Sequence, residues 1–204
     1  MTDDKTHRHH THTDRHGARQ PERFDPRHAA KLDDPGRFEI LPPERLFALL
    51  EAPNGGRVVD FGTGTGLFAA ELARQRPDLT IIALDEQPEM LARLEANPAA
   101  HAKNIVPAGP DALPRLRGTA DGVLALNVLH ELGDEATREL AALLTPSGRL
   151  VVADWNGAID RPVGPPRDHV YTPEEGRAKL ERVGLEIIDN ALWTHHYVLV
   201  ARRR

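Results

Sequence analysis

The sequence predicts an α/β fold built on a doubly wound, mostly parallel sheet, and three observations support this prediction. A short apolar segment, residues 58–61, leads into glycine at every second position (Gly62, Gly64 and Gly66) and then into a helical segment. From there on, short apolar segments alternate with amphipathic ones, which is typical of buried parallel strands joined by helices. The last two predicted strands have no helix between them, so they must pair in the antiparallel direction.

Length and composition set the first limits. The chain has 204 residues, enough for one domain with a sizeable core, and no cysteine, which excludes disulfides, thiolate metal sites and cysteine nucleophiles. A net charge of −5 gives no reason to expect nucleic acid as the main partner. No apolar run approaches the roughly 18 residues of a membrane span. We therefore expect a cytoplasmic protein with neither a nucleic-acid nor a membrane partner.

Residues 1–20 form a polar, histidine-rich leader that we expect to be disordered. Its histidines are weak candidates for a divalent-metal tether, and the alternative is a solvated tail that binds metal only incidentally. No metal site is assigned. The histidines in question are His7, His9, His10, His12 and His16.

The domain itself is expected over residues 21–204. Residues 21–56 form an N-terminal arm with scattered apolar anchors, in which a break at Asp34-Pro35-Gly36 precedes a helix that begins near Pro43 and ends near Glu51. Residues 57–204 form the α/β core. We expect the arm and the Pro/Gly-rich loop at 156–170 to be the segments that can cover a cleft.

Elements of the core are placed by apolar periodicity and by turn residues. The predicted strands are 58–61, 79–84, 104–107, 122–126, 149–153, 185–192 and 197–201. The predicted helices are 64–76, 88–96, 135–144 and 172–184, the last with Thr172 as its N-cap and Gly184 at its C-terminal end.

The glycine turn and two later strand ends point to a ligand site. A dinucleotide fingerprint has the spacing G-x-G-x-x-G, but Leu67 stands where its third glycine would be. Asp60 lies two residues before the first glycine, where its carboxylate can reach a cationic or hydroxyl-bearing ligand. Asp85 follows the second strand and can accept two hydrogen bonds from ribose hydroxyls. Asn127 follows the fourth strand and faces the same cleft.

Four segments, in order and spacing, resemble the motifs of class I S-adenosylmethionine-dependent methyltransferases, and are most similar to the small quinone-biosynthesis-like members. The segments are VVDFGTGTG (58–66), IIALDEQPEML (81–91), DGVLALNVLHEL (121–132) and LTPSGRLVVADW (144–155). The resemblance covers about residues 23–202. It implies a Rossmann-like, seven-stranded sheet of order 3-2-1-4-5-7-6 with strand 7 antiparallel, and S-adenosyl-L-methionine as cofactor.

By position, the resemblance also implies roles for single residues. Asp60 would lie near the methionine amine, the glycine turn would wrap the methionine and ribose, and Asp85 would hold the ribose hydroxyls. Gly109 stands where the family places an acid at the adenine, so either Asp111 substitutes from two residues on or this contact is missing. The implied cofactor-binding set is Asp60, Gly62, Thr63, Gly64, Gly66, Asp85, Glu86, Gln87, Asp111, Ala112, Leu126 and Asn127.

Methyl transfer from a sulfonium requires alignment of the acceptor, and a base only where the acceptor arrives protonated. The candidate catalytic residues are Asn127, His130, His169 and Tyr171. Each of the last three has a structural alternative as a packed loop residue. Asp154 either orients a cleft residue or caps a turn, and Trp155 either walls the cleft or belongs to the core. His195 and His196, in the terminal hairpin, are expected at the surface.

The acceptor is expected to be a small molecule, with a partner protein that closes the site as a further possibility. Two alternative functions stay open at this point. One is a non-catalytic S-adenosylmethionine-binding or metal-sensing protein, because the segment at Gly109 departs from the family pattern. The other is an NAD-dependent oxidoreductase, which Leu67 and the terminal antiparallel strands oppose.

Overall fold

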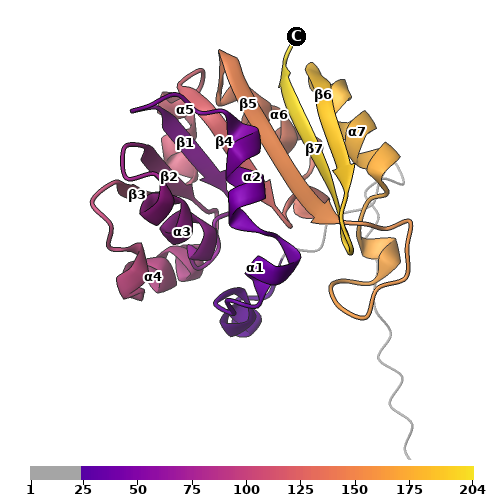
Figure 1. The fold of residues 1–204 in the computed structure, drawn as a ribbon, viewed down its shortest axis with the longest axis horizontal. Helices are drawn as coiled ribbons and strands as arrows, with labels where there is room; N and C mark the ends of the chain where they lie inside the picture. The colour runs from indigo at the N-terminus through magenta and orange to yellow at the C-terminus, as the bar shows by residue number, and fades with distance from the viewer. Residues whose placement is uncertain (1–23) are drawn as a thin grey trace, which may run out of the picture.

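The computed structural model describes residues 24–204. The predicted leader with its five histidines lies outside these residues. The described part forms one seven-stranded sheet of order β3-β2-β1-β4-β5-β7-β6 (Figure 1). The strands are β1 (Arg57–Phe61), β2 (Thr80–Leu84), β3 (Ile105–Ala108), β4 (Ala120–Leu126), β5 (Leu144–Trp155), β6 (Leu185–Leu192) and β7 (His196–Arg203).

The direction of the strands confirms the predicted fold class. Strands β1 to β5 pair with one another in parallel, whereas β7 is antiparallel to both β5 and β6. Strands β2 and β3 follow β1 on one side of it, and the chain then crosses to the other side to form β4. A crevice opens between β1 and β4, where the strand order reverses. In such sheets, ligands bind at this point, beyond the carboxyl ends of the strands.

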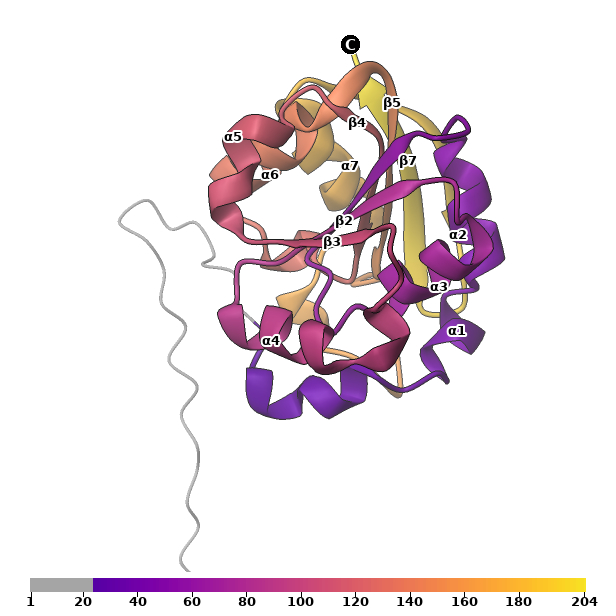
Figure 2. The same ribbon diagram turned by 90° about the vertical axis from the view of Figure 1, so that its left-hand side faces the viewer.

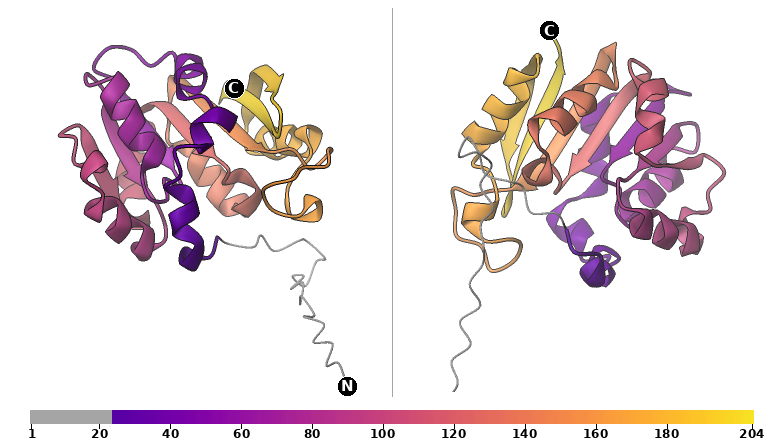
Figure 3. Two further views of the ribbon diagram at one scale, coloured as in Figure 1. Left: turned by 60° about the horizontal axis from the view of Figure 1, so that its bottom comes forward. Right: turned by 180° about the vertical axis from the view of Figure 1, so that it is seen from behind.

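Helices cover both faces of the sheet. Helices α2, α3 and α4 lie on one face, and α5, α6 and α7 lie on the other, as opposite views show (Figures 1 and 3). Their bounds are α2 (Pro43–Leu50), α3 (Leu67–Gln75), α4 (Pro88–Ala96), α5 (Leu113–Leu116), α6 (Asp134–Ala142) and α7 (Pro173–Arg182).

The core consists of two apolar layers, one on each side of the sheet. In β1, Val58 packs in the layer beneath α2 and α3, while its neighbour Val59 packs in the layer beneath α5, α6 and α7. Because successive side chains of a strand point to opposite faces, strands covered on both sides are apolar throughout. This explains why the central strands are apolar almost without interruption.

The described part of the N-terminal arm is helical. It contains the 3-10 helix η1 (Pro26–Leu32), the short helix α1 (Arg37–Ile40) and α2. Two perpendicular views place η1 beside α4, at the edge of the sheet where the parallel strands end (Figures 1 and 2). The arm therefore lies over the crevice.

Three elements differ from the predictions. Helix α3 begins at Leu67 rather than at Gly64, because Gly66 has a left-handed backbone (φ +84°) that no helical residue adopts. Strand β5 begins at Leu144 and includes the expected turn at 145–148, and the short helix α5 was not predicted. In residues 24–204, no helix is long and apolar enough to cross a membrane.

Candidate functional site

The glycine turn between β1 and α3 is shaped by close neighbours on two sides. Gly62, Gly64 and Gly66 all have positive φ angles, of +73°, +57° and +84°. A Cβ atom on Gly62 would lie 2.7 Å from Val128 Cγ2, and one on Gly64 would lie 3.0 Å from Leu32 Cδ1. Glycine is needed here both for the backbone conformation and for space. The turn is thus held between the arm and the loop after β4.

Asp60 is a buried carboxyl at the end of β1, only 3% exposed. Its Oδ2 accepts a hydrogen bond from Thr63 Oγ1 at 2.7 Å. Burial raises the pKa of Asp60 to about 6, and the hydrogen bond from Thr63 and the nearby Arg37 guanidinium oppose this rise. A cationic ligand group in the pocket would further favour the ionised form.

Asp85 lies at the end of β2 and is 7% exposed. Its two oxygens accept backbone N–H groups, Oδ2 from Gly64 at 2.8 Å and Oδ1 from Gln87 at 2.9 Å. Burial raises the pKa of Asp85, and these two hydrogen bonds limit the rise. Since a carboxylate has about four lone-pair sites, each oxygen can accept one more bond from a ligand.

Asn127 closes β4 with a left-handed backbone (φ +55°), a conformation that asparagine tolerates better than most residues. Its backbone N–H donates to Ala153 O at 2.8 Å, which fixes the residue between β4 and β5. Its side-chain Oδ1 is buried, and no hydrogen-bond donor in the described part of the chain reaches it. A buried acceptor of this kind costs free energy unless a ligand or water satisfies it.

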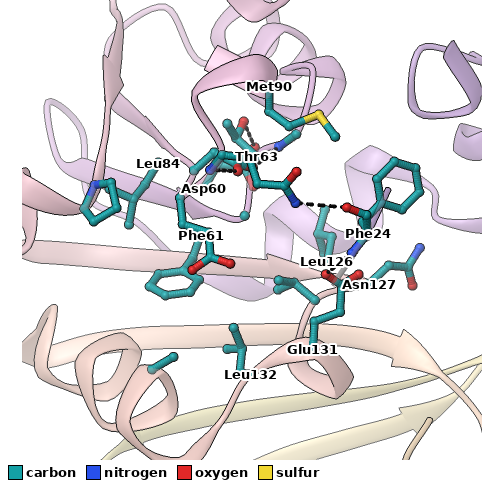
Figure 4. A pocket seen from close by; sticks show the side chains of 18 of the residues that line it. Phe24, Asp60, Phe61, Thr63, Leu84, Met90, Leu126, Asn127, Glu131 and Leu132 are labelled. Atoms are coloured by element: carbon teal, nitrogen blue, oxygen red, sulfur yellow. Dashed lines mark hydrogen bonds between the residues drawn. The ribbon is translucent and has the colours of Figure 1, made fainter. Parts of the chain in front are cut away.

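These groups surround one pocket of about 470 Å³, a size common for small-molecule sites. In Figure 4 the Met90 side chain lies at one side of the pocket, and Glu131 and Leu132 lie at the opposite side. Nine residues of the predicted cofactor set line it: Asp60, Gly62, Thr63, Gly64, Asp85, Glu86, Gln87, Leu126 and Asn127.

Three residues of the predicted set do not line this pocket: Gly66, Asp111 and Ala112. Gly66 is the N-cap of α3 and packs against Leu94. Asp111 is exposed, and its carboxylate lies over the backbone of Gly109. In this segment Pro110 and Leu113 reach the pocket instead.

Phe24 of the arm spans the pocket. Its carbonyl accepts a hydrogen bond from Gln87 Nε2 at 3.1 Å, and its N–H donates to Glu131 Oε2 at 3.0 Å (Figure 4). Arg37 also lines the pocket, donates to Leu32 O at 3.0 Å and stacks over Phe68. Arg37 is the only arginine or lysine that lines the pocket within residues 24–204.

His130 pairs with Asp154 next to the pocket. The imidazole Nδ1 lies 2.7 Å from Asp154 Oδ1, and the backbone N–H of His130 donates to Asp154 Oδ2 at 2.9 Å. Because an ionised carboxylate only accepts, Nδ1 is the protonated nitrogen in this pair. Asp154 is fully buried, so it orients His130, as one of the two predicted roles requires.

The four catalytic candidates differ in their relation to the pocket lining. His130, His169 and Tyr171 are not among its lining residues, whereas Asn127 is. Tyr171 packs against the core, with Lys179 Nζ 5.3 Å from the centre of its ring. Of the four candidates, only Asn127 lines the pocket, and His130 touches the lining through Glu131, with 3.7 Å between His130 Nε2 and Glu131 Oε1.

The expectation that His196 lies at the surface is wrong. His196 is completely buried and stacks on Trp155, with 4.1 Å between the ring centres. Trp155 is covered in turn by Arg161, whose guanidinium donates to carbonyls of the 156–165 loop. This loop folds over the hairpin, so it covers His196 rather than the pocket.

The pocket residues that were not predicted include Phe24, Arg37 and Glu131. The first two belong to the arm, and no local pattern indicates which arm residues face the crevice. Glu131 directly follows His130, so its place after β4 was a usable signal. In residues 24–204 no group of three or more histidine, aspartate or glutamate side chains could hold a metal ion.

Comparisons with known proteins indicate a family for this chain. Residues 34–191 match the family model described as "Methyltransferase domain". A solved SAM-dependent methyltransferase from Aquifex aeolicus has 27% identity and a TM-score of 0.79, over 88% of this chain and 98% of that one.

Curated relatives include enzymes with different acceptors. The release factor glutamine methyltransferase of Escherichia coli (strain K12) is 37% identical over 155 residues, 74% of this chain and 52% of that protein. The ubiquinone/menaquinone biosynthesis C-methyltransferase UbiE of Geotalea uraniireducens is 29% identical over 58% of this chain and 54% of that protein. This chain thus spans about half the length of these relatives.

A third relative is the ribosomal RNA small subunit methyltransferase C of Shewanella loihica, with 33% identity over 42% of this chain and 25% of that protein. Relatives named for a protein or an RNA overturn the prediction of partners. The prediction that limited the acceptor to a small molecule and excluded nucleic acid is therefore wrong. A net charge of −5 does not exclude a protein or an RNA as acceptor.

The family match also decides between the alternative interpretations of the glycine turn. The match covers most of the chain, and the sheet order and the antiparallel β7 agree with it. These findings do not support the alternative of an NAD-dependent oxidoreductase. The chain belongs to the methyltransferase domain family, with the fold and motifs of the class I S-adenosylmethionine-dependent methyltransferases.

Proposed function

We propose that the pocket binds S-adenosylmethionine and that the chain transfers the cofactor's methyl group to an acceptor. The observation that supports this most directly is the geometry of Asp85. Both of its oxygens are fixed by backbone N–H groups, and both keep acceptor capacity toward the pocket. A rigid carboxylate of this kind suits the two neighbouring hydroxyls of a ribose.

The opposite charges of Asp60 and Arg37 suit an α-amino acid. Asp60 would accept from the ammonium group of the methionine portion, and Arg37 would donate to its carboxylate. Asn127 Oδ1, a buried acceptor with no donor among the described residues, would accept a further N–H from the ligand. The apolar side chains of Met90, Leu126 and Leu113 would pack against the adenine.

The bound cofactor supplies an activated methyl group on a sulfonium, so the chain has to align the acceptor and exclude water. The Phe24 segment and Leu32 cover the pocket and serve the second task. Where the acceptor loses a proton, we assign His130 as the proton acceptor. Asp154 accepts its Nδ1–H, so Nε2, which lies 3.7 Å from Glu131 Oε1, is the nitrogen that would take up the proton.

The cofactor assignment is tested by a thermal-shift titration of the full chain with S-adenosylhomocysteine, with NAD as the control ligand. At about 100 times its dissociation constant, a ligand stabilises the native state by about 2.7 kcal/mol. We expect the midpoint to rise by several degrees with S-adenosylhomocysteine and not with NAD. A rise in the midpoint with NAD alone would contradict the proposal, and so would the absence of a rise with both ligands.

A further inference from the structure

Glu131 is a carboxyl that enters the pocket from the loop after β4. It ends the 3-10 helix η4 (Leu129–Glu131), and 17% of its side chain is exposed. Its Oε2 accepts the Phe24 N–H at 3.0 Å, and its Oε1 lies 3.7 Å from His130 Nε2. These contacts hold the carboxyl at the pocket wall, opposite Met90 (Figure 4).

The pocket has an excess of acidic groups over basic ones. Six carboxyl side chains line it, against Arg37 as the only arginine or lysine there within residues 24–204. Asp60 is bound by Thr63, Asp85 by two backbone N–H groups, Glu131 by the Phe24 N–H and Glu139 by Arg117. Of these four, Glu139 forms an ion pair with an arginine. Glu86 and Glu135 are exposed, whereas Glu131 is not.

The groups that face Glu131 leave its ionised form poorly compensated. Within the described residues these are His130 on the same loop, Asp154 from β5 and Asp85 from the end of β2. Burial raises the pKa of Glu131 to about 7, and the two carboxylates add to the rise, while His130 and the Phe24 N–H oppose it. A permanent cation in the pocket would stabilise the ionised carboxylate.

We propose that Glu131 is the counter-charge that makes this pocket prefer the sulfonium cofactor over the uncharged thioether product. The proposal rests on the proposed function, since it concerns the two forms of the same cofactor. S-adenosylmethionine has a fixed positive charge on sulfur, which S-adenosylhomocysteine lacks. An ionised carboxylate in a partly dehydrated pocket therefore binds the first ligand more tightly and leaves the affinity for the second nearly unchanged.

Isothermal titration calorimetry of the full chain tests this with both ligands at pH 7.5 and pH 5.5. Glu131→Gln removes the charge but keeps an oxygen that can accept the Phe24 N–H. We expect this variant to reduce the preference for S-adenosylmethionine roughly tenfold at pH 7.5, with S-adenosylhomocysteine affinity within about twofold of the wild type. Glu89→Gln, an exposed change of equal charge on α4, should leave the preference unaltered.

The pH dependence gives a second readout. In the wild type the preference should fall from pH 7.5 to pH 5.5 as Glu131 takes up its proton, and in Glu131→Gln this fall should be much smaller. Comparing the wild type with Glu131→Gln at the same pH cancels the titration of the ligands themselves. An equal fall in both proteins would assign the effect to another group, such as His130, and overturn the proposal.

Proton release provides an independent check. At pH 7.0, binding of S-adenosylmethionine should release roughly half a proton more than binding of S-adenosylhomocysteine. The number of protons released follows from the difference between the binding enthalpies in phosphate and in Tris buffer. An unchanged preference in Glu131→Gln would overturn the proposal, as would an equal loss of affinity for both ligands. Failure of the wild type to bind either ligand is a different outcome, because it contradicts the proposed function itself.

Discussion

The carboxylate of Asp85 accepts the backbone N–H of Gly64 at 2.8 Å, across 21 residues of sequence. This bond ties the glycine turn after β1 to the end of β2. The same carboxylate also lines the pocket, so one group both shapes the turn and faces the ligand. The order of the turn and the affinity for the cofactor should therefore depend on the same side chain.

Asp85→Asn should weaken binding of S-adenosylhomocysteine by at least tenfold. The asparagine amide has one acceptor oxygen, so its NH₂ group would meet either the Gly64 or the Gln87 N–H, and a ribose bond would be lost. Calorimetric titration measures the effect. The matched control is Asp121→Asn, because Asp121 also accepts a backbone N–H, from Arg57 at 2.9 Å, but does not line the pocket. Equal affinity of Asp85→Asn and wild type would refute the role of this carboxylate.

Gly62→Ala should destabilise the protein more than Gly118→Ala. Both glycines have positive φ angles, +73° and +68°, so the backbone cost of about 1–2 kcal/mol for a left-handed alanine is common to both changes. Only at Gly62 does the new methyl group meet a neighbour, Val128 Cγ2 at 2.7 Å, while nothing lies within 4 Å at Gly118. We expect roughly 2–4 kcal/mol for Gly62→Ala and about 1–2 kcal/mol for Gly118→Ala in urea unfolding.

A second change separates the steric contact from backbone strain. Val128→Ala should recover part of the loss when combined with Gly62→Ala, because it removes the methyl group in the way. If the double variant is no more stable than the sum of the single effects predicts, the contact is not the cause.

Much of this fold could be predicted because burial on both faces leaves a simple pattern. The central strands are apolar throughout, and β-strand ends place Asp60, Asp85 and Asn127 at one edge of the sheet. Once the strands are parallel, the topology alone brings these three residues together. That is why most of the proposed cofactor residues were found from the sequence.

The arm and the terminal hairpin show where this reasoning ends. Phe24 and Arg37 reach the pocket because the arm crosses the crevice, a path that no local periodicity encodes. His196 was expected at the surface because it was placed in the turn of the terminal hairpin. It is buried because Trp155 stacks on it and the 156–165 loop folds over both, which depends on contacts distant in sequence.

His196 should make the protein sensitive to mild acid. Neither ring nitrogen has a hydrogen-bond partner among the described residues, and burial lowers the pKa of His196 to about 4. Between this value and the ordinary 6.5, the unfolded chain binds a proton that the folded chain does not. The free energy of unfolding therefore falls as the pH falls through this window, by about 2 kcal/mol between pH 7 and pH 5.

His196→Phe keeps a ring against Trp155 and removes the titration. We expect its loss of stability from pH 7 to pH 5 to be smaller than that of the wild type by about 2 kcal/mol in urea unfolding. His101→Phe, at an exposed histidine, is the control and should retain the wild-type loss. A wild-type acid sensitivity in His196→Phe would show that other groups cause it.

Arg37 should distinguish ligands that contain an amino acid from those that do not. Its guanidinium lines the pocket, and we have assigned it to the methionine carboxylate. Arg37→Met retains most of the side-chain stem over Phe68 but removes the charge. We expect S-adenosylhomocysteine to bind about tenfold to a hundredfold more weakly, because a hydrogen bond to a charged group contributes about 1.5–3 kcal/mol. Binding of 5′-methylthioadenosine, which has no carboxylate, should change by less than about twofold.

A matched control for Arg37 is available on the same arm. Arg45→Met removes an exposed guanidinium that stacks on Trp193, 4.5 Å from the ring centre, and Arg45 does not line the pocket. Both ligands should bind this variant with wild-type affinity in calorimetric titrations. If Arg37→Met weakened 5′-methylthioadenosine as much as S-adenosylhomocysteine, Arg37 would act by holding the arm in place through its bond to Leu32 O. Selective loss of the amino-acid ligand is the result that only a direct contact explains.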